Sequence, residues 1–382
     1  MHSLPPAGQN KHCLRNKKVV LILNFGKFAV LTMLLCSLLC LPVNAQTRPD
    51  TAAESGILTV AETGEVLWEK SAQRKMAMAS TTKMMTALVA LEQADPDRTV
   101  TILPEWTGIE GSSMYLKEGE RYTLRQLLQG MMLVSGNDAA TAVACAVSGS
   151  EEAFVRLMNE KAQDLGLTDT HFENPHGLDG EEHYSTARDL AKLAAVAMEN
   201  PDFEEIVGMS SCTIGNQTYV NHNKLLRQCP GVIGVKTGYT KSAGRILVSC
   251  CQREGLRLIC VTLRDPQDWT DHRALYDWAY GTYHSEPILA AEPLPALPAA
   301  TGRGETVSVV PARPISVVTD GTDRITVRLY LPRIVFPGVQ RGEPAGTARV
   351  YRNGILYGEY PLQFGSDLPL PERKSLCRRT QI

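Results

Sequence analysis

The chain has 382 residues, 43% of them hydrophobic, and a formal net charge of −2. This length allows two domains with sizeable cores, and the near-neutral charge excludes the broad basic surface that nucleic-acid binding requires. Residues 1–45 differ from the rest because they carry five Lys or Arg and no acidic residue. Their apolar run FAVLTMLLCSLLCLPV ends at Val43-Asn44-Ala45, a pattern that predicts a signal peptide cleaved after Ala45.

Cleavage would leave a net charge of −7, whereas an uncleaved segment would act as a membrane anchor. No later stretch is long and apolar enough to span a membrane, so we expect an exported protein. Seven cysteines follow Ala45, an odd number that leaves at least one without a partner in its own chain. The sequence does not decide whether Cys212 and Cys229 form a disulfide bridge.

Residues 46–285 alternate helical and strand-like patterns and form the larger of the predicted domains. Two strand pairs are predicted, one turning at Glu62-Thr63-Gly64 and one near Glu254-Gly255. Between and after them, apolar residues recur at helical spacing. The predicted helices cover residues 81–93, 123–135, 137–148, 151–166, 186–200 and 271–283.

Residues 286–301, EPILAAEPLPALPAAT, are rich in Pro and Ala and predict a linker. Short alternating runs over residues 302–366 predict a small all-β domain, with a hairpin at Asn353-Gly354. Residues 367–382 form a basic tail in which Pro369 and Pro371 interrupt any helix. Such a tail has no useful apolar face, so membrane contact is expected to be peripheral at most.

Ser80 and Lys83 stand at the start of the predicted helix 81–93 in the pattern S-x-x-K. Residues three apart lie on one helix face, about 5–6 Å apart at Cβ. A hydroxyl becomes a nucleophile when a base takes its proton, and an amine can do so if burial and neighbouring cations lower its pKa. By itself the pair also fits a helix cap followed by a solvated lysine.

Two further motifs follow in a fixed order. Ser135-Gly136-Asn137 lies between two predicted helices, where a hydroxyl could relay a proton and an amide could hold a carbonyl. Taken alone, Asn137 could simply cap a helix. Lys236-Thr237-Gly238 follows an apolar strand that could pair with an extended peptide. The ordered triple S-x-x-K, S-x-N and K-T-G is the serine acyl-transfer signature of penicillin-binding proteins and serine β-lactamases.

Wider stretches resemble the low-molecular-mass D-alanyl-D-alanine carboxypeptidases, peptidase family S11, over about residues 50–285. The stretches are MASTTKMMTALVALE, GSSMYLKEGERYTLRQLLQGMMLVSGNDAATAVA, NEKAQDLGLTDTHFENPHGLDGEEHYSTARDLAKLA and VIGVKTGYTKSAGRILVS. The resemblance implies an α/β (α+β) fold, a penicillin-binding transpeptidase-like domain in which helices cover an antiparallel sheet. A small all-β domain follows it.

The resemblance also implies the chemistry. Ser80 would attack the carbonyl between two terminal D-alanines of a peptidoglycan stem peptide and Lys83 would accept its proton. Ser135 would pass that proton to the leaving D-alanine, and Asn137 would position the substrate. β-Lactams would acylate Ser80 covalently. No cofactor or metal is implied, and the oligomeric state is left open.

The remaining implied roles concern binding. Backbone N–H groups of Ser80 and Tyr239 would form the oxyanion hole. Lys236 and Thr237, with Gly238 allowing close approach, would hold the terminal carboxylate. Many family members add an arginine after these strands, and Arg273 is the candidate here.

The sequence also bears on three other functions. A class A β-lactamase needs a glutamate for its deacylating water, with an asparagine four residues later in the family pattern, and no Glu between Asn137 and Lys236 has one. A metalloenzyme would use His171, His176 and His183, whose spacing fits no common site. We expect these histidines to order a loop beside the site. A non-catalytic peptidoglycan-binding homologue would have lost a motif residue, yet all are present.

Overall fold

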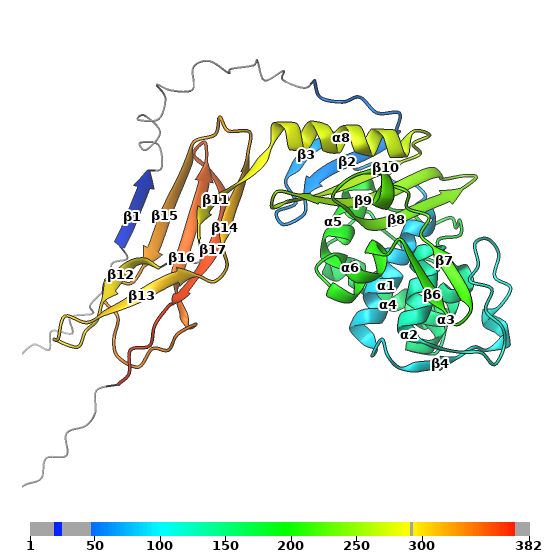
Figure 1. Ribbon diagram of the computed structural model, residues 1–382, viewed down its shortest axis with the longest axis horizontal. Helices are drawn as coiled ribbons and strands as arrows, with labels where there is room; N and C mark the ends of the chain where they lie inside the picture. The colour runs from blue at the N-terminus through cyan, green and yellow to red at the C-terminus, as the bar shows by residue number, and fades with distance from the viewer. Residues whose placement is uncertain (1–18, 25–46, 291–292, 371–382) are drawn as a thin grey trace, which may run out of the picture. The chain divides into compact units, whose positions relative to one another are not determined.

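The computed structural model describes residues 19–24, 47–290 and 293–370 (Figure 1). The chain divides into two compact units between Tyr283 and His284. The helical unit comprises residues 45–283, and the β unit comprises residues 284–382 together with residues 1–44. The apolar run of the predicted signal peptide lies outside the described residues.

The helical unit contains a five-stranded antiparallel sheet in the order β3-β2-β10-β9-β8. Its inner strands are built from β-branched and apolar residues that are buried on both faces. α8 packs on one face, against β9 and β10, and α5 packs on the other. The elements are β2 (Ser55–Val60), β3 (Val66–Lys70), β8 (Val232–Thr240), β9 (Gly244–Arg253), β10 (Leu256–Leu263), α5 (Ala187–Ala197) and α8 (Asp268–Thr282).

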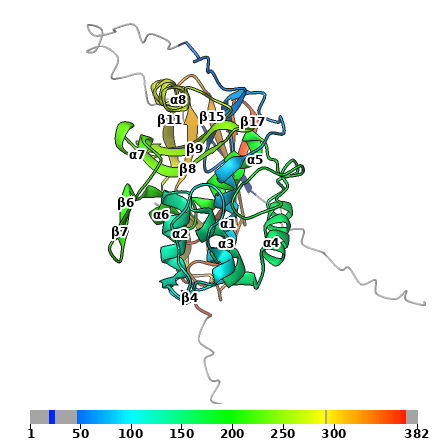
Figure 2. The ribbon, with the colours of Figure 1, turned by 90° about the vertical axis from the view of Figure 1, so that its right-hand side faces the viewer.

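α1 (Lys83–Gln93) lies inside a group of helices, because its residues Lys83–Ala90 are buried all round. Figures 1 and 2 show α1 enclosed by its neighbours, and it contacts five of the other helices. The remaining helical elements are η1 (Ala79–Thr82), η2 (Pro104–Trp106), α2 (Leu124–Leu133), α3 (Asn137–Ser148), α4 (Glu151–Asp164), α6 (Pro201–Gly208) and α7 (Leu225–Gln228). Two small hairpins complete the unit, β4 (Thr99–Thr101) with β5 (Arg121–Thr123) and β6 (Ser211–Ile214) with β7 (Gln217–Val220).

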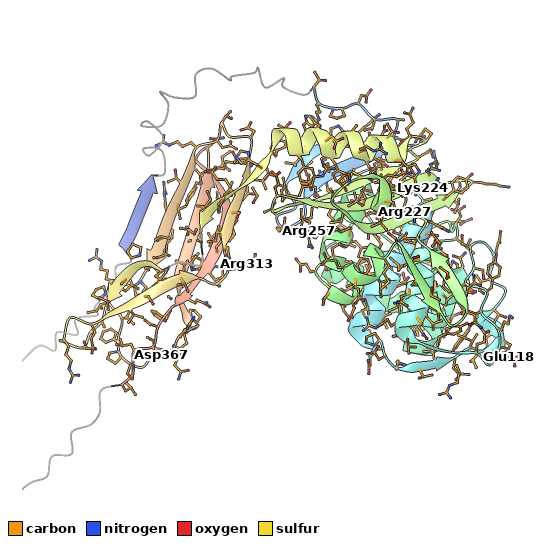
Figure 3. The ribbon with its side chains drawn as sticks, viewed as in Figure 1. Glu118, Lys224, Arg227, Arg257, Arg313 and Asp367 are labelled. Carbon is orange, nitrogen blue, oxygen red and sulfur yellow. The ribbon has the colours of Figure 1, made fainter. Side chains whose placement is uncertain are left out.

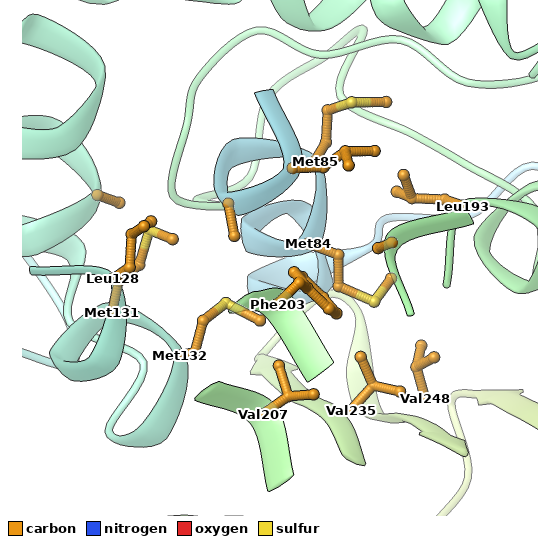
Figure 4. Close-up of a cluster of buried hydrophobic side chains, with 14 of the residues drawn as sticks. Met84, Met85, Leu128, Met131, Met132, Leu193, Phe203, Val207, Val235 and Val248 are labelled. Carbon is orange, nitrogen blue, oxygen red and sulfur yellow. The ribbon is translucent and has the colours of Figure 1, made fainter. Parts of the chain in front are cut away.

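The core of this unit fills the space between α1 and the sheet. Met84 of α1 packs with Met132 and Phe203 above Val235 and Val248 of the sheet (Figure 4). Fully burying side chains of this size stabilises a fold by about 1.5–3 kcal/mol each. This core fixes the start of α1 relative to β8, the two elements that carry the first and third motifs.

The β unit holds a six-stranded antiparallel sheet in the order β1-β15-β16-β17-β13-β12, and β11 pairs with β14 beside it. Asn353 and Gly354 both have positive φ and join β16 to β17, which confirms the predicted hairpin. The strands are β1 (Val19–Asn24), β11 (His284–Leu289), β12 (Leu294–Pro298), β13 (Thr306–Pro311), β14 (Ile315–Thr319), β15 (Ile325–Leu331), β16 (Pro344–Arg352) and β17 (Ile355–Phe364).

One expectation differs from the structure. Residues 286–301 were expected as a linker, yet most of them form β11 and β12. Proline is compatible with such positions because β12 is an edge strand of its sheet. The stretch expected as a signal peptide includes β1, which pairs with β15. Cys212 and Cys229, whose pairing the sequence left open, are both free thiols.

Candidate active site

Ser80 lines a cavity of about 750 Å³ and lies in η1, immediately before α1. Ala79 precedes it with φ 45°, a conformation that few residues other than glycine adopt. This backbone geometry turns the half-buried Ser80 towards the cavity, while Thr81 and Thr82 are buried. A hydroxyl at this position is accessible to a ligand and is held by a rigid element.

Lys83 is fully buried, and its Nζ lies 3.2 Å from Ser80 Oγ. The same nitrogen donates to Asn137 Oδ1 at 2.6 Å and to the His176 carbonyl oxygen. Burial lowers the pKa of Lys83 well below its usual value, and the nearby charge of Lys236 lowers it further. The environment therefore favours a neutral amine.

The hydrogen-bond partners of Lys83 accommodate both the neutral amine and the ammonium. A neutral amine has two N–H groups and one lone pair, whereas an ammonium has three N–H groups. In the neutral form, Asn137 Oδ1 and the His176 carbonyl accept the two hydrogens and the lone pair faces the hydroxyl of Ser80, whereas in the ammonium form the third hydrogen is donated to Ser80 Oγ. The neutral amine can act as the base that activates the hydroxyl.

Ser135 and Lys236 form the second half of the site. Lys236 Nζ donates to Ser135 Oγ at 3.0 Å and to the Thr237 carbonyl at 2.9 Å. Both side chains are buried, and burial lowers the pKa of Lys236 to about 7. Ser135 also lines the cavity with Ser80, so its hydroxyl faces the space that a reacting group would occupy.

β8 supplies the other wall of the cavity through Thr237, Gly238 and Tyr239. A Cβ atom at Gly238 would lie 3.3 Å from the amide nitrogen of Ser80, so the strand backbone approaches the nucleophile closely. β8 is an edge strand, and its outer backbone groups can pair with an extended peptide. The structure thus brings the three sequence motifs into one site.

Comparison with known proteins agrees with this geometry. Residues 42–267 match the model of a peptidase family described as D-alanyl-D-alanine carboxypeptidase. The chain belongs to this family. It is 32% identical over 345 residues to the D-alanyl-D-alanine carboxypeptidase DacF of Bacillus subtilis, covering 86% of this chain and 89% of that protein.

Two more members of the family extend the comparison. The D-alanyl-D-alanine carboxypeptidase DacB2 of Mycobacterium tuberculosis is 38% identical over 251 residues, which cover 63% of this chain and 86% of that protein. The structure of penicillin binding protein 5 from Haemophilus influenzae superposes with a TM-score of 0.70 at 27% identity. That superposition covers 85% of this chain and 99% of the other. The expected transpeptidase-like fold is therefore confirmed.

Arg273, the arginine suggested by the resemblance to the family, does not reach the cavity. It is exposed on α8, and the residues that line the cavity do not include it. Arg245 of β9 lines the cavity instead, directly opposite Tyr239. Its guanidinium donates to both carboxylate oxygens of the buried Asp268, at 2.7 and 2.9 Å. Sequence reasoning missed Arg245 because the cross-strand register determines which arginine faces the cleft.

The histidines of the middle region hold the backbone around the site. His183 Nδ1 accepts from the Glu173 amide at 3.0 Å, so the other ring nitrogen, Nε2, carries the hydrogen and donates it to Thr82 Oγ1 at an N–O distance of 2.7 Å. Burial lowers the pKa of His183 to about 4 and that of His176 to about 3. Neutral histidines are suited to the structural role expected of them. Among the described residues, no group of three or more His, Cys, Asp or Glu is arranged to hold a metal ion.

Asp138 is a further residue that sequence reasoning missed. This buried carboxylate accepts hydrogen bonds from the Met114 and Leu116 amides and from Ser113 Oγ, at 2.7 to 3.0 Å. It thereby attaches the 113–116 loop to the first turn of α3, which carries Asn137. The only sequence signal was an acidic residue in the first turn of a predicted helix, which is common in surface helices.

Proposed function

We propose that the protein is a serine-type D-Ala-D-Ala carboxypeptidase that removes the terminal D-alanine from peptidoglycan stem pentapeptides. One observation carries this proposal. The fully buried Lys83 lies 3.2 Å from Ser80 Oγ, and its remaining hydrogens are directed to other acceptors. Membership of the D-alanyl-D-alanine carboxypeptidase family supports the choice of substrate.

Acylation starts when Ser80 Oγ attacks the carbonyl carbon of the penultimate D-alanine. Lys83 takes the hydroxyl proton, and Ser135 delivers a proton to the nitrogen of the leaving D-alanine as the C–N bond breaks. Asn137 positions the substrate with its amide. Water then hydrolyses the ester on Ser80 and regenerates the enzyme.

The negative charge of the tetrahedral intermediate is stabilised by backbone N–H groups. Ser80 and Tyr239 supply them, since β8 runs close beside η1 at Gly238. Removing one such donor typically lowers kcat by about 10²–10³-fold.

The terminal carboxylate of the substrate binds to Lys236 and Thr237. Arg245 takes the part that the sequence suggested for Arg273, because it lines the cavity and keeps donors free of Asp268. An arginine held by a carboxylate loses little further freedom when it binds its ligand.

β-Lactams mimic the D-Ala-D-Ala terminus and acylate Ser80 covalently. The protein acts outside the cytoplasm, as its predicted signal peptide and its cell-wall substrate require. Within the described ranges, no helix is long and apolar enough to cross a bilayer. Contact with the membrane is at most peripheral.

The test measures D-alanine release from a stem pentapeptide by the wild type and by Ser80→Ala and Lys83→Ala. We expect Ser80→Ala to lose release by at least about 10⁴-fold, as when other serine hydrolases lose their nucleophile. Lys83→Ala should lose about 10³-fold or more, since an essential base is removed. Full activity of Lys83→Ala would overturn the assignment of the base.

A second measurement separates the proposal from its alternatives. A fluorescent penicillin should label the wild type and leave Ser80→Ala unlabelled, whereas a non-catalytic homologue would label neither. Nitrocefin should give a single slow burst. Rapid steady turnover of nitrocefin would instead identify a serine β-lactamase.

A further inference from the structure

The cavity at Ser80 extends well beyond the reacting groups. It continues past Ser135 along β7 and α7, where Val220, His222, Lys224 and Arg227 line it. Its volume of about 750 Å³ is in the range that encloses drug-sized ligands, far larger than a single alanine residue. The extension therefore has room for more substrate than the D-Ala-D-Ala terminus.

The position of the extension relative to the bond that breaks follows from one hydrogen bond. The His222 amide donates to the Leu133 carbonyl at 3.0 Å, which places His222 next to the end of α2. His222 lines the cavity together with Val134 and Ser135, the residues that follow α2. In the proposed function, Ser135 delivers the proton to the leaving nitrogen. The extension consequently lies on the side of the leaving group.

The charge of the extension is positive. Lys224 and Arg227 are exposed to the cavity, and Figure 3 shows them close together on the segment that leads to β8. Within residues 47–290 and 293–370, neither side chain forms an ion pair. Among the described residues that line the cavity, Asp268 is the one with a carboxylate, and this carboxylate already binds Arg245.

The terminal carboxylate of a D-Ala-D-Ala substrate is already assigned to Lys236 and Thr237, with Arg245 beside them. Lys224 and Arg227 therefore remain available for a second anionic group. Two cations on one wall, with no internal partner, stabilise a carboxylate by Coulomb attraction and by charge-assisted hydrogen bonds.

We propose that Lys224 and Arg227 form a leaving-group subsite for substrates whose leaving residue carries a second carboxylate. This inference rests on the proposed function and extends its substrate range. The C–N bond to the leaving residue breaks, the ester forms on Ser80, and the hydroxyl proton ends on the leaving nitrogen. Water then releases the acyl half. Such a leaving group is either an acidic D-amino acid or the acceptor half of a cross-link between two stem peptides.

The test uses three peptides with the same acyl half, diacetyl-L-Lys-D-Ala, joined to D-Ala, D-Glu or D-Gln. D-Glu and D-Gln have almost the same shape and differ in charge. The enzymes are the wild type, the double variant Lys224→Gln with Arg227→Gln, and Lys192→Gln as control. Lys192 is an exposed lysine of α5 that does not line the cavity.

We expect the wild type and Lys192→Gln to prefer D-Glu over D-Gln by about 10-fold in kcat/KM, as a charge-assisted contact would give. The double variant should lose this preference and should cleave the D-Ala peptide within about 2-fold of the wild type. An unchanged preference in the double variant would overturn the subsite. An equal loss of kcat/KM on all three peptides in the double variant would also overturn the subsite. Failure of the wild type to release D-Ala would instead refute the proposed function.

A cross-linked dimer of stem peptides distinguishes the two sources of the leaving group. If the wild type cleaves the dimer and the double variant is about 10-fold slower, the subsite serves cross-links. If the double variant is slower only on the D-Glu peptide and cleaves the dimer like the wild type, the subsite serves acidic terminal residues. If the double variant handles both like the wild type, the subsite is refuted.

Discussion

Lys83 and Lys236 are two buried amines that share one site, and each affects the other. Burial is the main reason why both have lowered pKa values, and Lys236 adds a repulsion that lowers the pKa of Lys83 further. The nearby Asp138 opposes this effect. A base made neutral by its surroundings works without a histidine, provided that the pH lies above its lowered pKa.

The dependence of acylation on pH tests this coupling. In Lys236→Gln the repulsion is absent, so the pKa of Lys83 rises and a higher pH is needed to make the amine neutral. The acid limb of the acylation rate by a β-lactam should therefore move to higher pH. Stopped-flow measurement of acylation between about pH 5 and 10 gives the limb for both proteins. An unmoved limb, or one at lower pH, would show that Lys236 does not influence the base.

Residue by residue, the sequence predicted the groups whose spacing is fixed locally. Ser80 and Lys83 belong to one helical turn, so their approach follows from S-x-x-K alone. The His176 carbonyl could not be predicted, since every residue has a carbonyl and only the tertiary fold places this one at Lys83. Arg245 and Arg273 both follow the third motif, and only the strand register decides between them.

At the scale of elements, the segment from His171 to Thr186 supports η1 from one side. Gly177 has φ +93°, and a Cβ atom there would lie 2.0 Å from the Ala79 carbonyl oxygen. The next residue towards the N-terminus, His176, supplies an acceptor for Lys83. The segment therefore has to approach η1 at a position where only glycine fits.

We expect Gly177→Ala to slow acylation by about 100-fold, because a misplacement of about 1 Å near the reacting atoms can cost that much. Gly149→Ala is the matched control, since Gly149 also has positive φ, +86°, but has open space around its Cβ position. Both variants should lose roughly 1–2 kcal/mol of stability from the backbone alone. Equal acylation rates in the two variants would show that the contact with Ala79 is unimportant.

The elements that the sequence predicted best are the hairpins. Gly64, Gly255 and Gly354 each supply a positive φ at the turn, a local signal that no tertiary contact needs to override. Residues 286–301 were predicted as a linker because their Pro and Ala residues hide the alternation of apolar and polar residues that is typical of a strand. They form strands because β11 pairs with β14 and β12 pairs with β13, and the local sequence does not reveal this pairing.

At the scale of the whole molecule, the two units have separate cores. The core of the helical unit runs from Ile57 to Leu263, and that of the β unit from Leu289 to Leu368, with no shared residue. Every group assigned to the reaction belongs to the helical unit. Each unit can therefore maintain its own packing.

A fragment of residues 47–283 should bind penicillin like the full chain. We expect its second-order acylation rate constant to lie within about 3-fold of that of the full chain, because the fragment keeps the whole core and site. The comparison uses a fluorescent penicillin, with circular dichroism to verify folding. A folded fragment that is not acylated would show that the β unit contributes to the reaction.

The three oxygen neighbours of the Lys83 nitrogen have one more consequence. Two of them occupy its hydrogens before the reaction, and the third, Ser80 Oγ, is in place to receive the hydrogen that the nitrogen gains. The surroundings thus solvate the ammonium as completely as the free amine, without any rotation of a side chain. Proton transfer to and from Lys83 accordingly requires little reorganisation of its surroundings. The same rigid arrangement can therefore serve both the formation and the hydrolysis of the ester on Ser80.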